Sequence, residues 1–156
     1  MASPVSAADG EVEPWGRVEA WEIMVDKTLA DGCFAVRTYS DGTDLRIGFD
    51  MRSRQLYLSF YADALQVVRS GRMHTLEFVF DDAVRHVRPM AAVPSQGRTV
   101  MIDTLDRPFV ADFVKRTTLS VSFRAMEATR IPLAGNAAML LALLECQRQF
   151  DPTRNG

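Results

Sequence analysis

Two cysteines, Cys33 and Cys146, are the residues of this sequence whose type and position suggest the most definite chemistry. Neither has a second cysteine or a histidine within four residues, which is the spacing that structural zinc sites usually show. One cysteine near each end of the folded part favours a disulfide, and the alternative is a pair of buried free thiols. A structural disulfide is typical of the periplasm or the extracellular space, whereas free thiols are typical of the cytosol.

A catalytic role for Cys33 would need a neighbouring base, and the sequence offers two, His74 and His86. His74 shares a strand face with Phe78, which predicts a histidine at the rim of the core. His86 lies among arginines and is predicted to be a surface residue. The sequence contains no GxSxG, Walker A, GxGxxG or HExxH motif. We therefore predict no catalytic residues, no metal and no cofactor, and keep a small hydrolase using His74 or His86 as an alternative.

The composition is that of a folded protein, with 47% hydrophobic and 24% charged residues. A net charge of -2 and a pI near 5.7 argue against a nucleic-acid partner. All but two of the 18 basic residues are arginines, whose planar guanidinium suits carboxylate or phosphate. Because these arginines are scattered along the chain, we expect most of them to be solvated surface residues.

The sequence predicts no membrane span, because its longest apolar run, AAMLLALL, is far shorter than the roughly 18 residues that a span needs. The opening MASPVSAADGEVEPWG lacks the charged start and apolar segment of an export signal. Its small polar residues are typical of the part that remains after such a signal has been removed. We expect three parts: a flexible lead (1–16), a single β-rich domain (17–152) and a disordered tail (153–156).

Alternating apolar residues predict the strands that must position these side chains. A first strand runs from Trp21 to Val25, and CFAVRTYS and DLRIGFD form a hairpin with a type I′ turn at Asp41-Gly42. Further strands are predicted at QLYLSFY, MHTLEFVFDD, RHVRPMAAV, GRTVMIDTL and LSVSFRAM. Pro89 places RHVRPMAAV at an edge or a bulge.

Three helical segments are predicted beside the strands. ADALQVVRSG forms a turn or two that end at Gly71, and FVADFVKRT begins after Asp106. The last helix, AAMLLALLECQRQF, carries Cys146 on its apolar stripe. The predicted fold is therefore mainly β or α+β, an antiparallel sandwich or partly open barrel of about eight strands with a short internal helix and a packed C-terminal helix.

The expected partner surface is an outward strand face on which tyrosines alternate with arginines. Tyrosine and arginine are enriched at the centres of protein interfaces. The alternative is that a second layer covers these residues and makes them core. The candidate residues are Tyr39, Tyr57, Tyr61, Arg37 and Arg46.

Three segments resemble one family in their order along the chain: DGCFAVRTYSDGTDLRI, LEFVFDD and IPLAGNAAMLLALLEC. Together, from Trp21 to Cys146, they resemble the small exported proteobacterial domains of the invasion-associated locus B group. That group has further cysteines in mid-chain, which this sequence lacks. The resemblance implies an exported, non-enzymatic domain, and no functional residue is carried over from it.

Three functional hypotheses follow from these observations. The first is a periplasmic or secreted domain that binds a protein or an envelope component, with a cytoplasmic location as the alternative. The second is a carrier of a small apolar ligand, with an interior pocket lined by Leu56, Leu58, Phe60, Leu76, Phe78 and Phe80. The third is the histidine-dependent hydrolase.

Overall fold

The structure, a computed structural model, describes residues 11–66 and 68–151 of the 156-residue chain. The described residues form ten strands and two α-helices. The strands are β1 (Val12–Val18), β2 (Trp21–Asp26), β3 (Gly32–Thr38), β4 (Asp44–Asp50), β5 (Gln55–Tyr61), β6 (Met73–Phe80), β7 (Val84–Ser95), β8 (Arg98–Thr104), β9 (Thr118–Phe123) and β10 (Met126–Pro132). The helices are α1 (Arg107–Lys115) and α2 (Asn136–Phe150), and two short 3-10 turns are η2 (Lys27–Leu29) and η3 (Asp63–Leu65).

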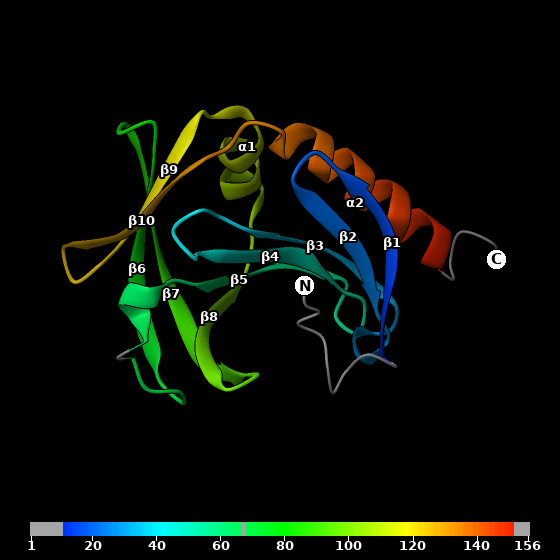
Figure 1. Cartoon of the computed structure of the whole chain (residues 1–156), viewed down its shortest axis with the longest axis horizontal. Coiled ribbons are helices and arrows are strands. Elements are labelled where there is room, and N and C mark those ends of the chain that lie inside the picture. Colours follow the sequence, from blue (N-terminus) through cyan, green and yellow to red (C-terminus); the bar gives the residue numbers. More distant parts are fainter. Residues whose placement is uncertain (1–10, 67, 152–156) are drawn as a thin grey trace.

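All ten strands belong to one antiparallel sheet with the order β1-β2-β3-β4-β5-β8-β7-β6-β9-β10. The long strand β7 joins two halves of this sheet. Its residues Val84–Ala91 pair with β6, and Ala91–Ser95 pair with β8. Figure 1 shows β6, β7, β9 and β10 on the left, and β1 and β2 on the right beside α2. The sheet is therefore bent about β7 and remains open.

The bend lets both halves bury the same face in one continuous core. Trp21, Ile23 and Phe60 from one half, and Phe78 and Val121 from the other, belong to that core and are fully buried. Helix α2 contacts β1, β2, β3 and α1, so the two helices close the core where the sheet halves leave it open. Such burial of apolar surface is the dominant stabilising term in folding.

The predicted fold class is confirmed, and the architecture is one open sheet rather than two separate ones. The prediction lacked two of the ten strands, β1 and β10, which are the two edges of the sheet. The predicted flexible lead (1–16) is too long, because β1 begins at Val12 and pairs with β2. Residues 1–10 of that lead and the predicted tail (153–156) lie outside the described residues.

Two local predictions need correction. The β3–β4 turn is not type I′, because Gly42 has a positive φ of 86° and Asp41 does not. The backbone of Tyr39 and Thr43 closes a longer loop, in which the Asp41 carboxylate accepts from the Thr43 amide at 2.9 Å. One or two helical turns were predicted to end at Gly71, whereas the helical structure among the described residues of this segment is the single turn η3, which ends at Leu65.

The position of Pro89 agrees with its chemistry. Proline has no amide hydrogen to donate to a neighbouring strand. Pro89 lies in the half of β7 that pairs with β6 alone, so β7 is locally an edge there although it is central in the sheet. The prediction of an edge position therefore holds for this segment but not for the whole strand.

The side-chain amide of Asn136, which is fully buried, links three elements of the core. Its Oδ1 accepts a hydrogen bond from Trp21 Nε1 at 3.1 Å, and its Nδ2 donates to the Phe113 carbonyl at 3.1 Å. One amide thereby satisfies polar groups of β2 and α1 from the first turn of α2. Buried polar groups that lose such partners are strongly destabilising.

We predict that Asn136→Ala lowers the free energy of unfolding by about 2–4 kcal/mol, because both the indole N–H and the carbonyl lose their partner. Urea denaturation measures the change. The matched control is Gln149→Ala, which removes the exposed hydrogen bond from Trp15 Nε1 to Gln149 Oε1 and should change stability by less than about 1 kcal/mol. Equal losses in the two variants would contradict a special role for the buried amide.

Candidate functional site

The structure brings the sulfur atoms of Cys33 and Cys146 to disulfide-bonding distance, 2.01 Å. Both cysteines are fully buried, one at the start of β3 and the other in α2. The neighbouring Gln147 reinforces this junction, because its Oε1 accepts from the Cys33 amide at 2.7 Å and its Nε2 donates to the Asp31 carbonyl at 3.1 Å. The end of α2 is thus attached to the start of β3. The cysteine pair therefore lies where it stabilises the fold.

We predict that the oxidised protein is more stable than Cys33→Ala/Cys146→Ala by about 4 kcal/mol, because a bridge across most of the chain restricts the unfolded state. Guanidinium denaturation with and without reductant measures the difference. Reductant should lower the stability of the wild-type protein and leave the double variant unchanged. Alkylation of both cysteines in denatured protein that has never met a reductant would show that the bridge does not form.

The three tyrosines of the expected partner surface are buried, with exposed fractions of 7% for Tyr39, 7% for Tyr57 and 9% for Tyr61. The expectation of an exposed aromatic face therefore needs correction. What covers the rings includes arginine side chains, since the guanidinium of Arg37 lies 4.3 Å from the ring centre of Tyr39. Arginine over an aromatic face is an attractive arrangement that also removes ring surface from water.

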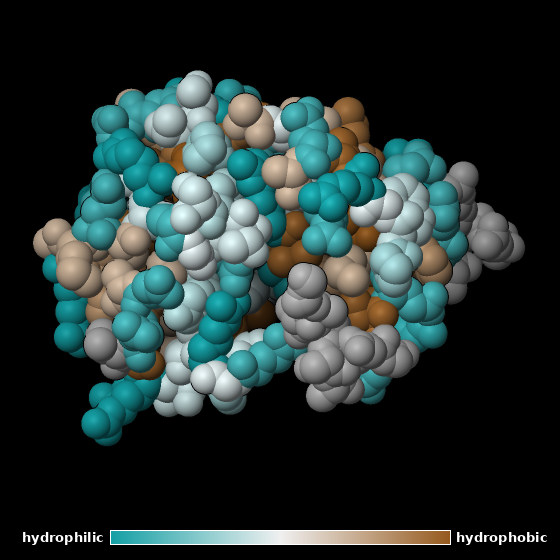
Figure 2. Space-filling model, in the orientation of Figure 1, coloured by the Kyte–Doolittle hydropathy of each residue, from teal (hydrophilic) through white to brown (hydrophobic). Residues whose placement is uncertain are grey.

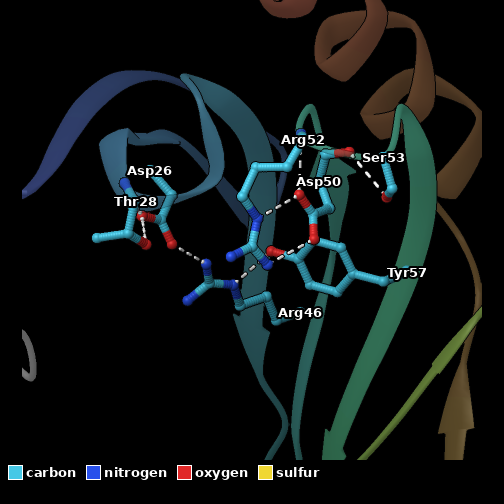
Figure 3. A network of polar contacts seen from close by, with 7 residues as sticks. All are labelled: Asp26, Thr28, Arg46, Asp50, Arg52, Ser53 and Tyr57. Carbon is cyan, nitrogen blue, oxygen red and sulfur yellow. Dashed lines mark hydrogen bonds and ion pairs between the residues drawn. The ribbon is translucent and has the colours of Figure 1, made fainter.

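Arg46 is the centre of one polar network on the face of the sheet that does not form the core (Figure 3). Its guanidinium donates to Asp26 Oδ2 at 2.6 Å, and its Nε donates to the Tyr57 hydroxyl at 2.9 Å. The same guanidinium lies 3.6 Å from the ring centre of Phe34. Asp26 is itself held by Thr28, so Arg46 has little freedom to move.

A second network of the same kind lies nearby around Arg98 on β8. Its guanidinium stacks over Tyr61 at 3.9 Å and forms an ion pair with Asp44. Asp44 also accepts from the Thr38 hydroxyl. Arg46 and Arg98 thus each combine one carboxylate with one or two aromatic rings, on neighbouring parts of one sheet face.

Between these two networks lies a groove of about 300 Å³. Its apolar lining includes Met24, Phe34, Val36 and Val100, and its polar lining includes the two arginines with Ser59 and Thr38. Figure 2 shows hydrophobic surface between hydrophilic residues in the middle of this view of the molecule. Two of the five predicted binding residues, Arg46 and Tyr61, line this groove, and Tyr57 supports Arg46 from beside it.

The tyrosines of this region keep their protons. Burial raises the pKa of Tyr39 to about 12, and its hydroxyl is a buried group without a hydrogen-bond partner among the described residues. Burial likewise raises the pKa of Tyr57, against the opposing effect of Arg46. The hydrogen bond to Asp63 is the main cause of the raised pKa of Tyr61. The charges beside the groove therefore come from arginines and carboxylates alone.

The two histidines lie away from Cys33, on β6 and β7. His86 is not the surface residue that was predicted, because its side chain is 16% exposed and its Nε2 lies 2.8 Å from Asp112 Oδ2. Its ring packs edge-on against Phe80 and Phe109. His74 is half-buried with its ring edge-on to Phe123, as expected for a residue at the rim of the core.

The Asp112 carboxylate accepts hydrogen bonds from His86 and from Arg116 Nε at 3.1 Å. Chiefly because of the hydrogen bond from His86, the pKa of Asp112 is below its ordinary value. A carboxyl whose pKa is lower in the folded state stabilises the fold above its unfolded pKa of about 3.9, and this contribution is lost as the pH falls through the lower folded value. The pair fastens α1 to β7.

We predict that Asp112→Asn lowers the free energy of unfolding by about 1–2 kcal/mol at neutral pH and makes its decline between about pH 5 and pH 3 shallower than in the wild type. Urea denaturation across this pH range measures both effects. Asp31→Asn is the control, because the Asp31 carboxylate makes no hydrogen bond in the described part of the chain. A decline that is as steep in Asp112→Asn as in the wild type would contradict the assignment.

No local sequence pattern marks Arg98 and Asp44 as neighbours of Tyr61, because the three residues meet only through the pairing of β8 with β5 and of β4 with β5. Within residues 11–66 and 68–151, no group of three or more His, Cys, Asp or Glu residues could hold a metal ion. Neither helix in the same range is long and apolar enough to cross a bilayer.

Comparison with known proteins identifies the fold. No protein-family model and no curated protein match the chain. Among solved structures, the crystal structure of invasion associated protein B from Bartonella henselae is similar, with a TM-score of 0.57 and 12% sequence identity over 85% of this chain and 96% of that chain. The predicted resemblance is therefore confirmed at the level of structure, and the chain shares the fold of that bacterial protein.

Proposed function

We propose that this protein is an exported, non-enzymatic binding domain that recognises a protein partner through the groove between Arg46 and Arg98. The observation that carries the proposal is the pair of arginine–aromatic–carboxylate networks on either side of an apolar floor. Fixed aromatic and arginine side chains around a small apolar cavity are typical of the centres of protein interfaces.

The chemistry of the groove favours a protein over a small ligand. Its lining mixes apolar side chains with hydroxyls and with guanidinium groups whose charge is already balanced by Asp26 and Asp44. A partner side chain inserted here would bury apolar surface and find hydrogen-bond donors at the rim without leaving an unpaired charge. Because the arginines are held in place before binding, little side-chain entropy is lost on association.

An oxidising compartment is supported by the buried cysteine pair at disulfide distance. The structural similarity to a bacterial invasion-associated protein points in the same direction. Both observations favour a domain that works outside the cytoplasm.

The carrier hypothesis receives no support from the core. The side chains that were expected to line an interior pocket pack against one another and against α1: Phe60 meets Phe78 at 6.5 Å between ring centres, and Phe78 meets Phe109 at 5.2 Å. Leu58, Phe60, Leu76, Phe78 and Phe80 are fully buried members of one continuous cluster, with Leu56 packed against it.

The hydrolase hypothesis also has less support than the binding hypothesis. A histidine base must contact the hydroxyl or thiol that it activates. Among the described residues, His86 makes its polar contact with Asp112, and its ring is enclosed by phenylalanines. The Nε2 atom of His74 is buried and has no hydrogen-bond partner in the described part of the chain.

Site-specific photocrosslinking in the native host tests the proposed function. A photoreactive phenylalanine analogue at Ser59, in the groove, should give a discrete adduct whose partner is identified by mass spectrometry. The same analogue at Leu141, which is exposed on α2, should not give that adduct.

With the purified partner, Arg98→Ala should raise the Kd at least about tenfold, which corresponds to the loss of roughly 1.4 kcal/mol of binding free energy.

The matched control is Arg130→Ala, because Arg130 is a strand arginine that is also ion-paired, with Asp82 and Glu127, but does not line the groove. Its Kd should stay at the wild-type value. Equal weakening by both substitutions would contradict the groove as the binding site. Turnover on a panel of hydrolase or transferase substrates, abolished by one polar substitution, would overturn the non-enzymatic proposal itself.

A further inference from the structure

A second depression, of about 260 Å³, lies at the opposite end of the sheet from α2 and is lined by three arginines. Arg69 and Arg72 come from the segment before β6, and Arg124 comes from the turn between β9 and β10. His74 and Phe123 complete the lining with Val68. In Figure 1 both chain segments lie on the left of the molecule.

These three arginines have no carboxylate partner among the described residues, which is also true of Arg17, Arg37 and Arg107, but only these three line one depression together. Most described arginines form an ion pair, namely Arg46, Arg52, Arg54, Arg85, Arg88, Arg98, Arg116, Arg130 and Arg148. Arg69, Arg72 and Arg124 form none among the described residues, and they share one depression. Three unbalanced positive charges close together repel one another, and a bound anion would relieve that repulsion.

The backbone holds two of these arginines in defined places. The Arg72 carbonyl accepts from the Ala92 amide at 2.8 Å, and the Gly71 amide donates to the Ala92 carbonyl at 2.8 Å, so the loop is attached to β7. Arg124 occupies a two-residue turn with Ala125, with φ values of 52° and 64°. A type I′ turn of this kind prefers asparagine and glycine, so arginine is placed here against the local backbone preference.

We propose that this depression binds a phosphate group. A guanidinium presents several N–H donors in a plane that matches the oxygens of phosphate, and three of them from two loops can surround one dianion. The buried Nε2 atom of His74, which has no partner among the described residues, lies in the same wall. The site is separate from the groove between Arg46 and Arg98, so it stands independently of the proposed function.

The surroundings favour a phosphate that belongs to a lipid headgroup. The adjoining depression shares His74, Phe123 and Arg124 with this one and is also lined by Met73 and Val87. Met73 is 62% exposed, Val87 50%, and Met126, beside the Arg124 turn, 49%. Exposed apolar side chains around a basic site are the arrangement that contacts acyl chains while the cations hold the headgroup.

Titration with inorganic phosphate, followed by NMR of the arginine Nε–H groups, tests the site. The signals of Arg72 and Arg124 should shift and saturate, whereas those of the exposed Arg17 and Arg107 should not. Arg72→Gln/Arg124→Asn should weaken phosphate binding at least tenfold, and asparagine at 124 keeps the turn because it favours the same backbone conformation. The control Arg17→Gln/Arg107→Gln removes the same charge elsewhere and should bind phosphate normally.

Cosedimentation with vesicles separates the two sources of phosphate. Vesicles of phosphatidylcholine with one fifth phosphatidylglycerol should retain the wild-type protein and the control variant but not Arg72→Gln/Arg124→Asn, which would identify a headgroup site. Phosphate binding without vesicle binding would support the site for a soluble phosphate ester. The absence of a saturable shift together with no vesicle binding would overturn the proposal, as would equal weakening by the site and control variants.

Discussion

The bend of the single sheet at β7 is the constraint on which the rest of the structure depends. A flat sheet of ten strands would expose too much apolar surface for two helices of nine and fifteen residues to cover. Because the two halves turn toward each other, each half covers part of the other, and the helices need only close the remaining gap. The contact between Thr43, in the β3–β4 loop, and Thr129, on β10, shows how far this curvature brings distant strands together.

The same curvature explains why chemistry gathers on the opposite face. Side chains alternate along a strand, so every strand that contributes to the core also presents residues outward. On the half formed by β2 to β5 and β8, these outward residues include aromatic rings, and arginines lie over them. On the half formed by β6, β7, β9 and β10, the outward residues leave exposed methionine and valine beside unpaired arginines. The groove lies on this outward face, whereas the arginine-lined depression lies beside it, where Val68 and Phe123 of the core reach the surface.

The sequence patterns predicted correctly those structural features that depend on residues close together in the chain. Alternation at Leu45 to Phe49, the cap at Asp106 and the apolar stripe of α2 each depend on neighbours within a few residues, and each was predicted correctly. The edge strands β1 and β10 were missed because they are only partly buried and therefore carry a weak alternation. The partners of Arg46 and Arg98, and the meeting of Arg72 with Arg124, depend on strand pairing between distant segments, for which the sequence has no local signal.

An open sheet has two edge strands whose outer amide and carbonyl groups could pair with another copy of the chain. Here both edges are irregular: β1 carries Pro14 and a bulge before Gly16, and β10 carries a bulge between Glu127 and Thr129 and ends at Pro132. Proline removes a donor, and a bulge breaks the even spacing that a new strand would need. These irregularities discourage growth of the sheet from one molecule to the next. The sheet can therefore remain open without acting as a template for fibre formation.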